Sequence, residues 1–91
     1  MRIHFPNDPP QYCGPDLTLT FPAVVDGKRV DCCITAEALE DHFGARSPRE
    51  EDALHAFNRH RDKIHGAARE LLETLGDTPV ILHSGYFRFR E

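Results

Sequence analysis

Two runs of alternating hydrophobic and polar residues, joined by Asp26-Gly27, form the clearest pattern in the chain. An Asp-Gly pair between such runs is typical of a two-residue type I′ turn in a β-hairpin. The pattern therefore predicts antiparallel strands over residues 17–25 and 28–35. The register that this turn sets places apolar residues of both strands on one face: Leu17, Leu19, Phe21, Ala23, Val30, Cys32 and Ile34.

The segment before the hairpin is short and rich in proline. Residues 2–5 alternate in polarity and predict a first strand, and the prolines from Pro6 onward predict an extended loop through Pro15. We expect Tyr12 to hold this loop against the core. Pro22 lies within the first hairpin strand with its missing N–H directed away from the partner strand. The outer side of that strand is therefore expected to be a sheet edge or a bulge.

A short helix is predicted directly after the hairpin, over residues 36–43. Thr35 is a suitable N-cap for it, and Gly44 is a suitable residue to end it. Two turns of helix are not stable alone, so we expect this helix to pack on the rest of the domain.

A long amphipathic helix is predicted over residues 48–75. Ser47 and Glu50 have the spacing of a capping box, and Pro48 suits the first helical position. Gly66 weakens the middle of the helix, so a kink or break near it is the alternative to one continuous helix. The apolar residues fall on one stripe: Ala53, Leu54, Phe57, Ile64, Ala68, Leu71, Leu72 and Leu75.

The C-terminal segment predicts a strand or a hairpin over residues 79–90. Residues 80–83 form a short apolar run that suits a buried strand, and Ser84-Gly85 is a weak turn signal. Residues 86–90 then alternate in polarity. Either these residues fold back as the second strand of a hairpin, or they leave the domain and pair with another chain.

Together these elements predict one α+β domain over residues 1–91. In it, an antiparallel sheet of three to five short strands packs against the long and the short helix. The composition agrees, because 40% hydrophobic and 29% charged residues are typical of a soluble globular protein. No apolar run is long enough to cross a membrane, and the N-terminus lacks a secretory signal, so we expect a cytoplasmic protein.

The histidines and cysteines do not have the spacing of a metal site. His55, His60 and His65 are five residues apart, so successive side chains turn by about 140° around a helix. We expect His60 to border the core and His55 to be solvated. No Cys-x-x-Cys motif occurs, and we expect no metal, no cofactor and no catalytic residue. Cys33 is the candidate exposed thiol, because the hairpin register turns Cys32 inward.

Four basic residues are candidates for a surface that binds a partner or nucleic acid: Arg59, Lys63, Arg88 and Arg90. The two C-terminal arginines alternate with aromatic residues, as in some strands on which nucleic-acid bases stack. An amphipathic strand and a solvated helix explain the same pattern. The net charge of −4 argues against a broad basic surface, so nucleic acid is not the favoured partner.

The residues also carry a family resemblance. It is centred on the run from Phe21 to Gly44 and extends to Ile3-His4-Phe5-Pro6, Ala56-Phe57, Ile64 and Val80-Ile81-Leu82. In these positions the chain resembles a family of small bacterial proteins known as domain of unknown function 1488. The resemblance implies a stand-alone cytoplasmic α+β domain and supplies no catalytic residues. Some members carry the label of transcriptional regulator. The aromatic tail from Tyr86 to Phe89 departs from the family's usual ending.

The function expected from these observations is that of a small non-enzymatic interaction or regulatory module. A homodimer formed through a sheet edge or through the C-terminal strand is expected, because a sheet of this kind leaves edges that self-association covers. The first alternative is a nucleic-acid-associated transcriptional regulator. The second is a small thiol-based enzyme or redox protein that uses Cys33.

Overall fold

The structure is a computed structural model of the chain and describes residues 1–88. Within this range the chain forms five strands and four helices, which confirms the predicted α+β class. The strands are β1 (Ile3–His4), β2 (Gln11–Cys13), β3 (Thr18–Val25), β4 (Lys28–Thr35) and β5 (Val80–Leu82). The helices are α1 (Ala36–His42), α2 (Glu50–Arg59), α3 (Arg61–Leu75) and α4 (Ser84–Arg88).

The sheet is mixed rather than antiparallel. Its strand order is β1-β3-β4-β5, and β2 also pairs with β3. β1, β2 and β4 run antiparallel to β3, whereas β5 runs parallel to β4, so the predicted antiparallel sheet is wrong at β5. The reason is the connection between β4 and β5, which contains α1, α2 and α3. A helical crossover carries the chain from the end of the sheet where β4 finishes back to the end where β4 begins, and this makes the two strands parallel.

The β3–β4 hairpin has the predicted register. Val25 pairs with Lys28 at the turn, and every partner expected along the two strands is the observed one. Asp26 and Gly27 have φ angles of 50° and 85°, as a type I′ turn requires. Leu17 does not extend the buried face as predicted. It precedes β3, has a φ of 52° and is 46% exposed, because the chain turns there before the strand begins.

Pro22 divides the outer side of β3 between two strands. β1 pairs with β3 at Val24 and Val25, and β2 pairs with it at residues 18–20, so Pro22 lies in the gap between them. Proline has no N–H to donate to an outer strand, which explains why pairing stops at this residue.

The loop predicted through Pro15 contains a strand that the sequence did not indicate. Residues Gln11–Cys13 form β2, and pairing with β3 overrides the weak strand pattern of this segment. Tyr12 holds the segment in place, as expected. Its hydroxyl donates a hydrogen bond to the carbonyl oxygen of Pro48 at 2.7 Å.

α1 begins and ends almost as predicted. The Thr35 hydroxyl accepts a hydrogen bond from the Ala38 N–H at 3.1 Å and so caps the helix. The last helical residue is His42, one residue before the predicted end. Gly44 follows with a φ of 76° and turns the chain away from the helix axis.

The helix predicted over residues 48–75 is two helices. α2 ends at Arg59 and α3 begins at Arg61, with His60 between them at φ −118° and ψ 27°. The break is therefore at His60 and not near Gly66, which is helical. An unbroken helix of the predicted length would measure about 42 Å at about 1.5 Å per residue. The longest dimension of the molecule is 35 Å, so the bend keeps both halves over the sheet.

The capping box predicted at the start of this helix is not formed. The Ser47 hydroxyl donates to the Asp52 carboxylate at 2.6 Å and accepts from the Arg49 N–H at 3.2 Å. Pro48 therefore precedes the helix instead of opening it. α2 begins at Glu50, and its cap residue Arg49 makes no side-chain hydrogen bond at this end.

The strand predicted within residues 79–90 is present as β5. The alternative prediction of a hairpin over this range is wrong for the described residues, because residues 84–88 form the helix α4. Residues 89–91 lie outside the described part of the chain. Phe87 is buried, and its ring lies edge-on to that of Phe43 with the centroids 5.1 Å apart. Phe87 thus packs toward the end of α1, and the Tyr86 hydroxyl donates to the Glu70 carboxylate of α3 at 2.9 Å.

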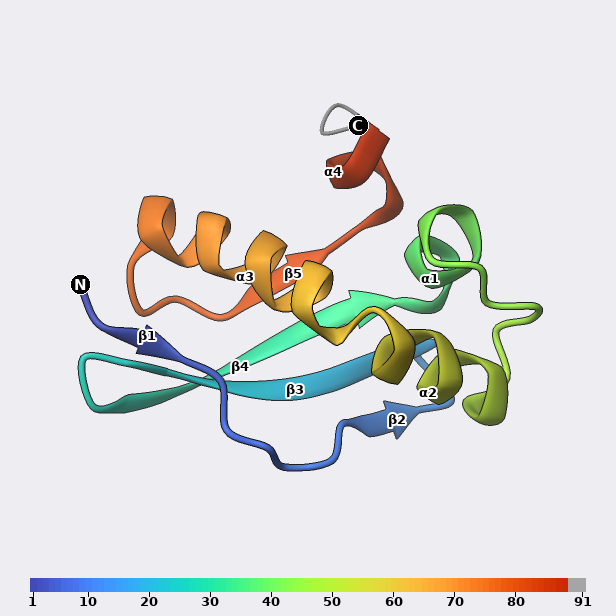
Figure 1. The fold of residues 1–91 in the computed structure, drawn as a ribbon, viewed down its shortest axis with the longest axis horizontal. Coiled ribbons are helices and arrows are strands. Elements are labelled where there is room, and N and C mark those ends of the chain that lie inside the picture. Colours follow the sequence, from blue (N-terminus) through green and yellow to red (C-terminus); the bar gives the residue numbers. More distant parts are fainter. Residues whose placement is uncertain (89–91) are drawn as a thin grey trace.

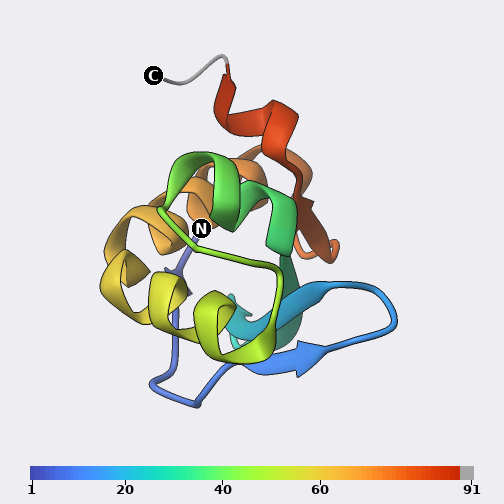
Figure 2. The same ribbon diagram turned by 90° about the vertical axis from the view of Figure 1, so that its right-hand side faces the viewer.

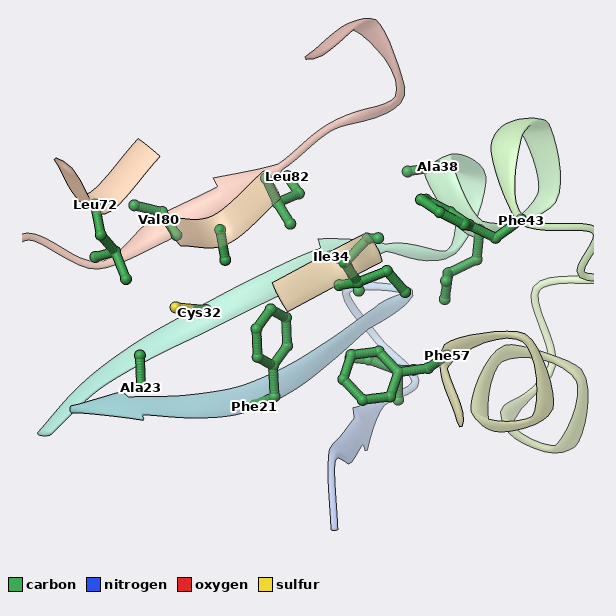
Figure 3. Close-up of a cluster of buried hydrophobic side chains, with 14 of the residues drawn as sticks. Phe21, Ala23, Cys32, Ile34, Ala38, Phe43, Phe57, Leu72, Val80 and Leu82 are labelled. Atoms are coloured by element: carbon green, nitrogen blue, oxygen red, sulfur yellow. The ribbon is translucent and has the colours of Figure 1, made fainter. Parts of the chain in front are cut away.

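The helices α1, α2 and α3 cover one face of the sheet (Figures 1 and 2). The core lies between the two layers, where Phe21, Cys32 and Ile34 of the hairpin meet Phe57 and Leu72 of the helices (Figure 3). The opposite face of the sheet has no covering layer among residues 1–88. On it, Thr20 and Cys33 are half-buried and Ile81 is 52% exposed.

Candidate functional site

A cavity of about 630 Å³ lies between α1 and α2, and we call it the basic hollow. This volume is within the range of small-molecule sites in proteins. Buried Phe43 and Ala56 form its floor. The remaining lining side chains are polar or charged: His42, Arg46, Asp52, His55, Arg59 and His60.

Two helices and the connection between them build this site. Gly44 ends the turn after α1, and residues 44–49 then cross between α1 and α2, as Figure 2 shows. This crossing carries Arg46 to the hollow. His55 and Arg59 are four residues apart on α2 and therefore lie on the same side of the helix. The break after Arg59 places His60 against Phe43, with the ring centroids 5.5 Å apart.

The basic hollow carries more positive than negative charge. Arg46 and Arg59 line it with Asp52 as the only carboxylate, and Asp52 already accepts a hydrogen bond from Ser47. Within residues 1–88 the ion pairs are Lys28–Asp77 and Arg29–Asp8, so neither arginine of the hollow is paired. On a chain with a net charge of −4, this is a local excess of positive charge.

The three histidines of the hollow do not form a metal site. In the described part of the chain, no group of three or more histidine, cysteine, aspartate or glutamate side chains is placed to hold a metal ion. His55 is exposed and His60 is partly buried, as the helix pattern predicted. His42 is held by Ser84, whose carbonyl oxygen lies 3.1 Å from its Nε2 atom.

Of the four basic residues singled out in the sequence, the structure describes Arg59, Lys63 and Arg88, and only Arg59 and Lys63 line a common hollow. Arg59 and Lys63 line the same shallow hollow at the break between α2 and α3. Lys63 also borders a second cavity of about 530 Å³ with Phe87 of α4. Arg88 ends α4, which is separated from α2 by α1 (Figures 1 and 2). Arg90 lies outside the described residues.

Ser84, Asp41 and His42 form a hydrogen-bonded cluster that the sequence did not reveal. The buried Ser84 hydroxyl donates to the Asp41 carboxylate at 2.5 Å and lies 3.3 Å from His42 Nε2. In a catalytic Ser-His-Asp triad the carboxylate bonds to the imidazole, and the imidazole bonds to the hydroxyl. Here the carboxylate accepts the hydrogen bond from the hydroxyl directly. The cluster therefore connects α4 to α1.

Cys33 lies on the uncovered face of the sheet, where the register placed it. It is half-buried, and its Sγ atom is 3.5 Å from the Thr20 hydroxyl. Cys32 points into the core, and burial, together with the nearby Cys33 and Asp31, raises the pKa of its thiol to about 12. A protonated, inaccessible thiol is not reactive, so Cys32 acts as a core residue.

His65 is part of the core boundary, a role that spacing on the helix did not indicate. Its ring is stacked on Phe5 with centroids 4.3 Å apart and lies 5.6 Å from Phe21. Burial lowers the pKa of His65 below its ordinary value, and the neighbouring Arg61 and Arg69 lower it further, whereas Asp62 acts in the opposite direction.

This lowered pKa predicts a contribution of His65 to the pH dependence of stability. As the pH falls through the ordinary pKa of 6.5, the unfolded chain binds a proton at His65 more readily than the folded chain does. The folded state therefore loses stability relative to the unfolded state as the pH falls from the ordinary pKa toward the lowered pKa of His65. We expect His65→Phe to lose less unfolding free energy than the wild type between about pH 7.5 and pH 5, as measured by urea denaturation. The exposed His83→Phe is the control, and equal losses in the wild type and His65→Phe would contradict the assignment.

These features define a small two-layer α+β domain with a basic, ligand-sized cavity on its helical side. Residues 3–82 match the sequence model of the protein family of unknown function DUF1488, and the chain belongs to that family. The match extends from β1 to β5 and confirms the resemblance found in the residues, while α4 lies beyond it. No curated protein and no solved structure matches the chain. None of the helices described within residues 1–88 combines the length and apolar character that crossing a membrane requires.

Proposed function

We propose that the protein is a small non-enzymatic interaction module that acts in the cytoplasm as a homodimer. The observation that carries this proposal is the free outer edge of β5. This strand is the last in the sheet order and pairs only with β4 among residues 1–88. An unpaired edge offers a row of backbone N–H and C=O groups to another strand.

The composition of the two sheet edges favours β5 as the interface. The other edge is formed by β1 and β2, which are separated by a segment containing Pro6, Pro9 and Pro10. These prolines interrupt the β1–β2 edge, whereas β5 is one uninterrupted strand that begins directly after Pro79. Ile81, at the centre of β5, is 52% exposed, and Val80 and Leu82 on either side are buried. Two copies of β5 that pair antiparallel around Ile81 would continue the sheet and cover this side chain in both chains.

Two further observations support a cytoplasmic, non-enzymatic role. Cys13, Cys32 and Cys33 are all free, which suits a reducing compartment. The Ser84 hydroxyl, in the grouping most similar to a hydrolytic triad, is buried and donates to the Asp41 carboxylate, whereas in a triad it donates to the imidazole.

The test is the oligomeric state of the Ile81→Glu variant. We expect the wild type to approach twice its chain mass of 10.4 kDa as its concentration rises through the micromolar range in sedimentation velocity experiments. Ile81→Glu places two like charges side by side at the two-fold axis and is expected to remain monomeric. Because Ile81 is half-exposed, the substitution leaves the core intact, and the thermal unfolding curve checks this.

Leu17→Glu is the matched control. Leu17 is also exposed and apolar, but it lies next to β3 near the opposite edge of the sheet, so its replacement is expected to leave the dimer unchanged. A wild-type chain that stays monomeric up to about 500 μM would contradict the proposal. So would equal dissociation by the two substitutions.

A further inference from the structure

We propose that the basic hollow between α1 and α2 binds a small organic phosphate, with Arg46, His55 and Arg59 contacting the phosphate group. The hollow is lined by residues of α1, of α2 and of the segments that follow these helices, and none of its lining residues belongs to the sheet. This binding site is therefore independent of the proposed dimer.

The arginines provide the first argument. Arg46 and Arg59 are exposed, line one cavity from different elements and have no ion-pair partner within residues 1–88. Two guanidinium groups that line one cavity provide several N–H donors for one multiply charged oxyanion. Asp52, the single carboxylate of the lining, accepts a hydrogen bond from the Ser47 hydroxyl and forms no ion pair with either arginine, so two positive charges face one negative charge.

Helix capping does not explain the whole cluster. Basic residues near the C-terminal ends of α1 and α2 are favoured by the helix dipole, and this accounts for His42 and Arg59. It does not account for Arg46, which lies in the connection, or for His55, which lies in the middle of α2. Their convergence on the same cavity is a tertiary feature and favours a ligand.

The donor set favours an anion over a metal ion. A metal site would need three or more suitable ligands in reach of one point, and the described residues hold no such group. The unpaired side chains at the mouth are instead cationic or imidazole groups, which bind phosphate oxygens.

The shape and floor of the hollow favour an organic phosphate over the free ion. A volume of about 630 Å³ is several times that of a phosphate ion, and the floor is made of the apolar side chains Phe43 and Ala56. His60 stands against Phe43 and extends this aromatic wall. The charged groups at the mouth can thus hold the phosphate while a ring or short hydrocarbon part rests on the floor.

The test is a titration of the full chain, labelled with ¹⁵N, with phenyl phosphate and with inorganic phosphate at constant ionic strength. We expect saturable shifts of backbone amide signals within residues 42–60, with phenyl phosphate binding more tightly than inorganic phosphate. The double variant Arg46→Gln/Arg59→Gln is expected to bind phenyl phosphate at least about tenfold more weakly, because two charge-assisted contacts are lost. Thermal unfolding confirms that the variant is folded.

Arg49→Gln is the matched control, because Arg49 lies in the same connection, does not line the hollow and makes no capping side-chain bond. It removes the same type of charge and is expected to leave the affinity within about twofold. Equal weakening by Arg49→Gln, or shifts reproduced by sodium chloride alone, would overturn the proposal. A third outcome would also overturn the proposal. If a single-stranded oligonucleotide binds through Arg46 and Arg59 while phenyl phosphate shows no saturable binding, the hollow is part of a nucleic-acid surface. Loss of the dimer in Ile81→Glu would not affect any of these outcomes.

Discussion

Replacement of Leu72 by aspartate is expected to abolish cooperative folding of the domain. Leu72 is 0% exposed and lies on α3 over the sheet, near Val80 of β5 (Figure 3). An ionised carboxylate at this position would have no partner and no access to water, which costs roughly 3–5 kcal/mol or more. Small domains of this size have a total stability of about 5–15 kcal/mol, so such a loss is comparable with the whole.

Leu71→Asp is the control for this prediction, because it makes the same chemical change one residue earlier on the same helix. Leu71 is only partly buried, so its carboxylate can reach solvent, and we expect a folded protein with a lowered melting temperature. Far-ultraviolet circular dichroism during heating separates the two outcomes. A cooperative transition of Leu72→Asp at the wild-type temperature would contradict the placement of α3, and so would unfolding of both variants to the same extent.

The contrast between these two leucines shows what helical periodicity can and cannot predict. A stripe drawn over one continuous helix includes Leu71, Leu72 and Leu75, but Leu75 is 52% exposed. The stripe fails at Leu75 although this residue has nearly the same facing angle as buried Ile64, because Leu75 is the last residue of α3. The break at His60 separately turns α3 relative to α2, so one stripe does not describe both helices. Nothing in the local pattern marks His60 as a break. The bend is imposed by the sheet that the helices must cover.

The β-hairpin was predictable for the opposite reason, because its information is local. The Asp-Gly turn and the alternation of apolar residues select the same register, and each would have been sufficient alone. The C-terminal segment also alternates, yet it forms α4, because Ser84 and Phe87 find partners in α1 and directly after it, more than forty residues earlier in the chain. Alternation without a strong turn therefore does not establish a strand.

The basic hollow could not be predicted from the sequence, because its residues come together only in the folded chain. Arg46 has no motif around it, and only the turn at Gly44 and the crossing to α2 bring it near His55 and Arg59. In the sequence, Arg59 stands out by its basic neighbours on the helix, and this pattern groups it with Lys63, Arg88 and Arg90. The fold instead places Arg59 with Arg46. Residues joined by tertiary structure alone become visible only when the packing of the helices is known.

Gly27→Val is expected to destabilise the domain by about 1–3 kcal/mol, through backbone strain alone. Gly27 has a φ of 85°, a region that β-branched residues rarely adopt. A Cβ atom at this position would meet no heavy atom within 4 Å, so steric overlap with the rest of the protein adds nothing to the cost. The register of β3 and β4 depends on this turn, and urea denaturation measures the loss.

Gly66→Val is the matched control for this prediction, because a Cβ atom there also meets nothing within 4 Å. Gly66 has ordinary helical geometry within α3, where valine is no worse than glycine, so we expect stability within about 0.5 kcal/mol of the wild type. A large loss in Gly27→Val with little change in Gly66→Val would assign the cost to the positive φ of the turn. Equal effects of the two substitutions would contradict the type I′ geometry that sets the hairpin register.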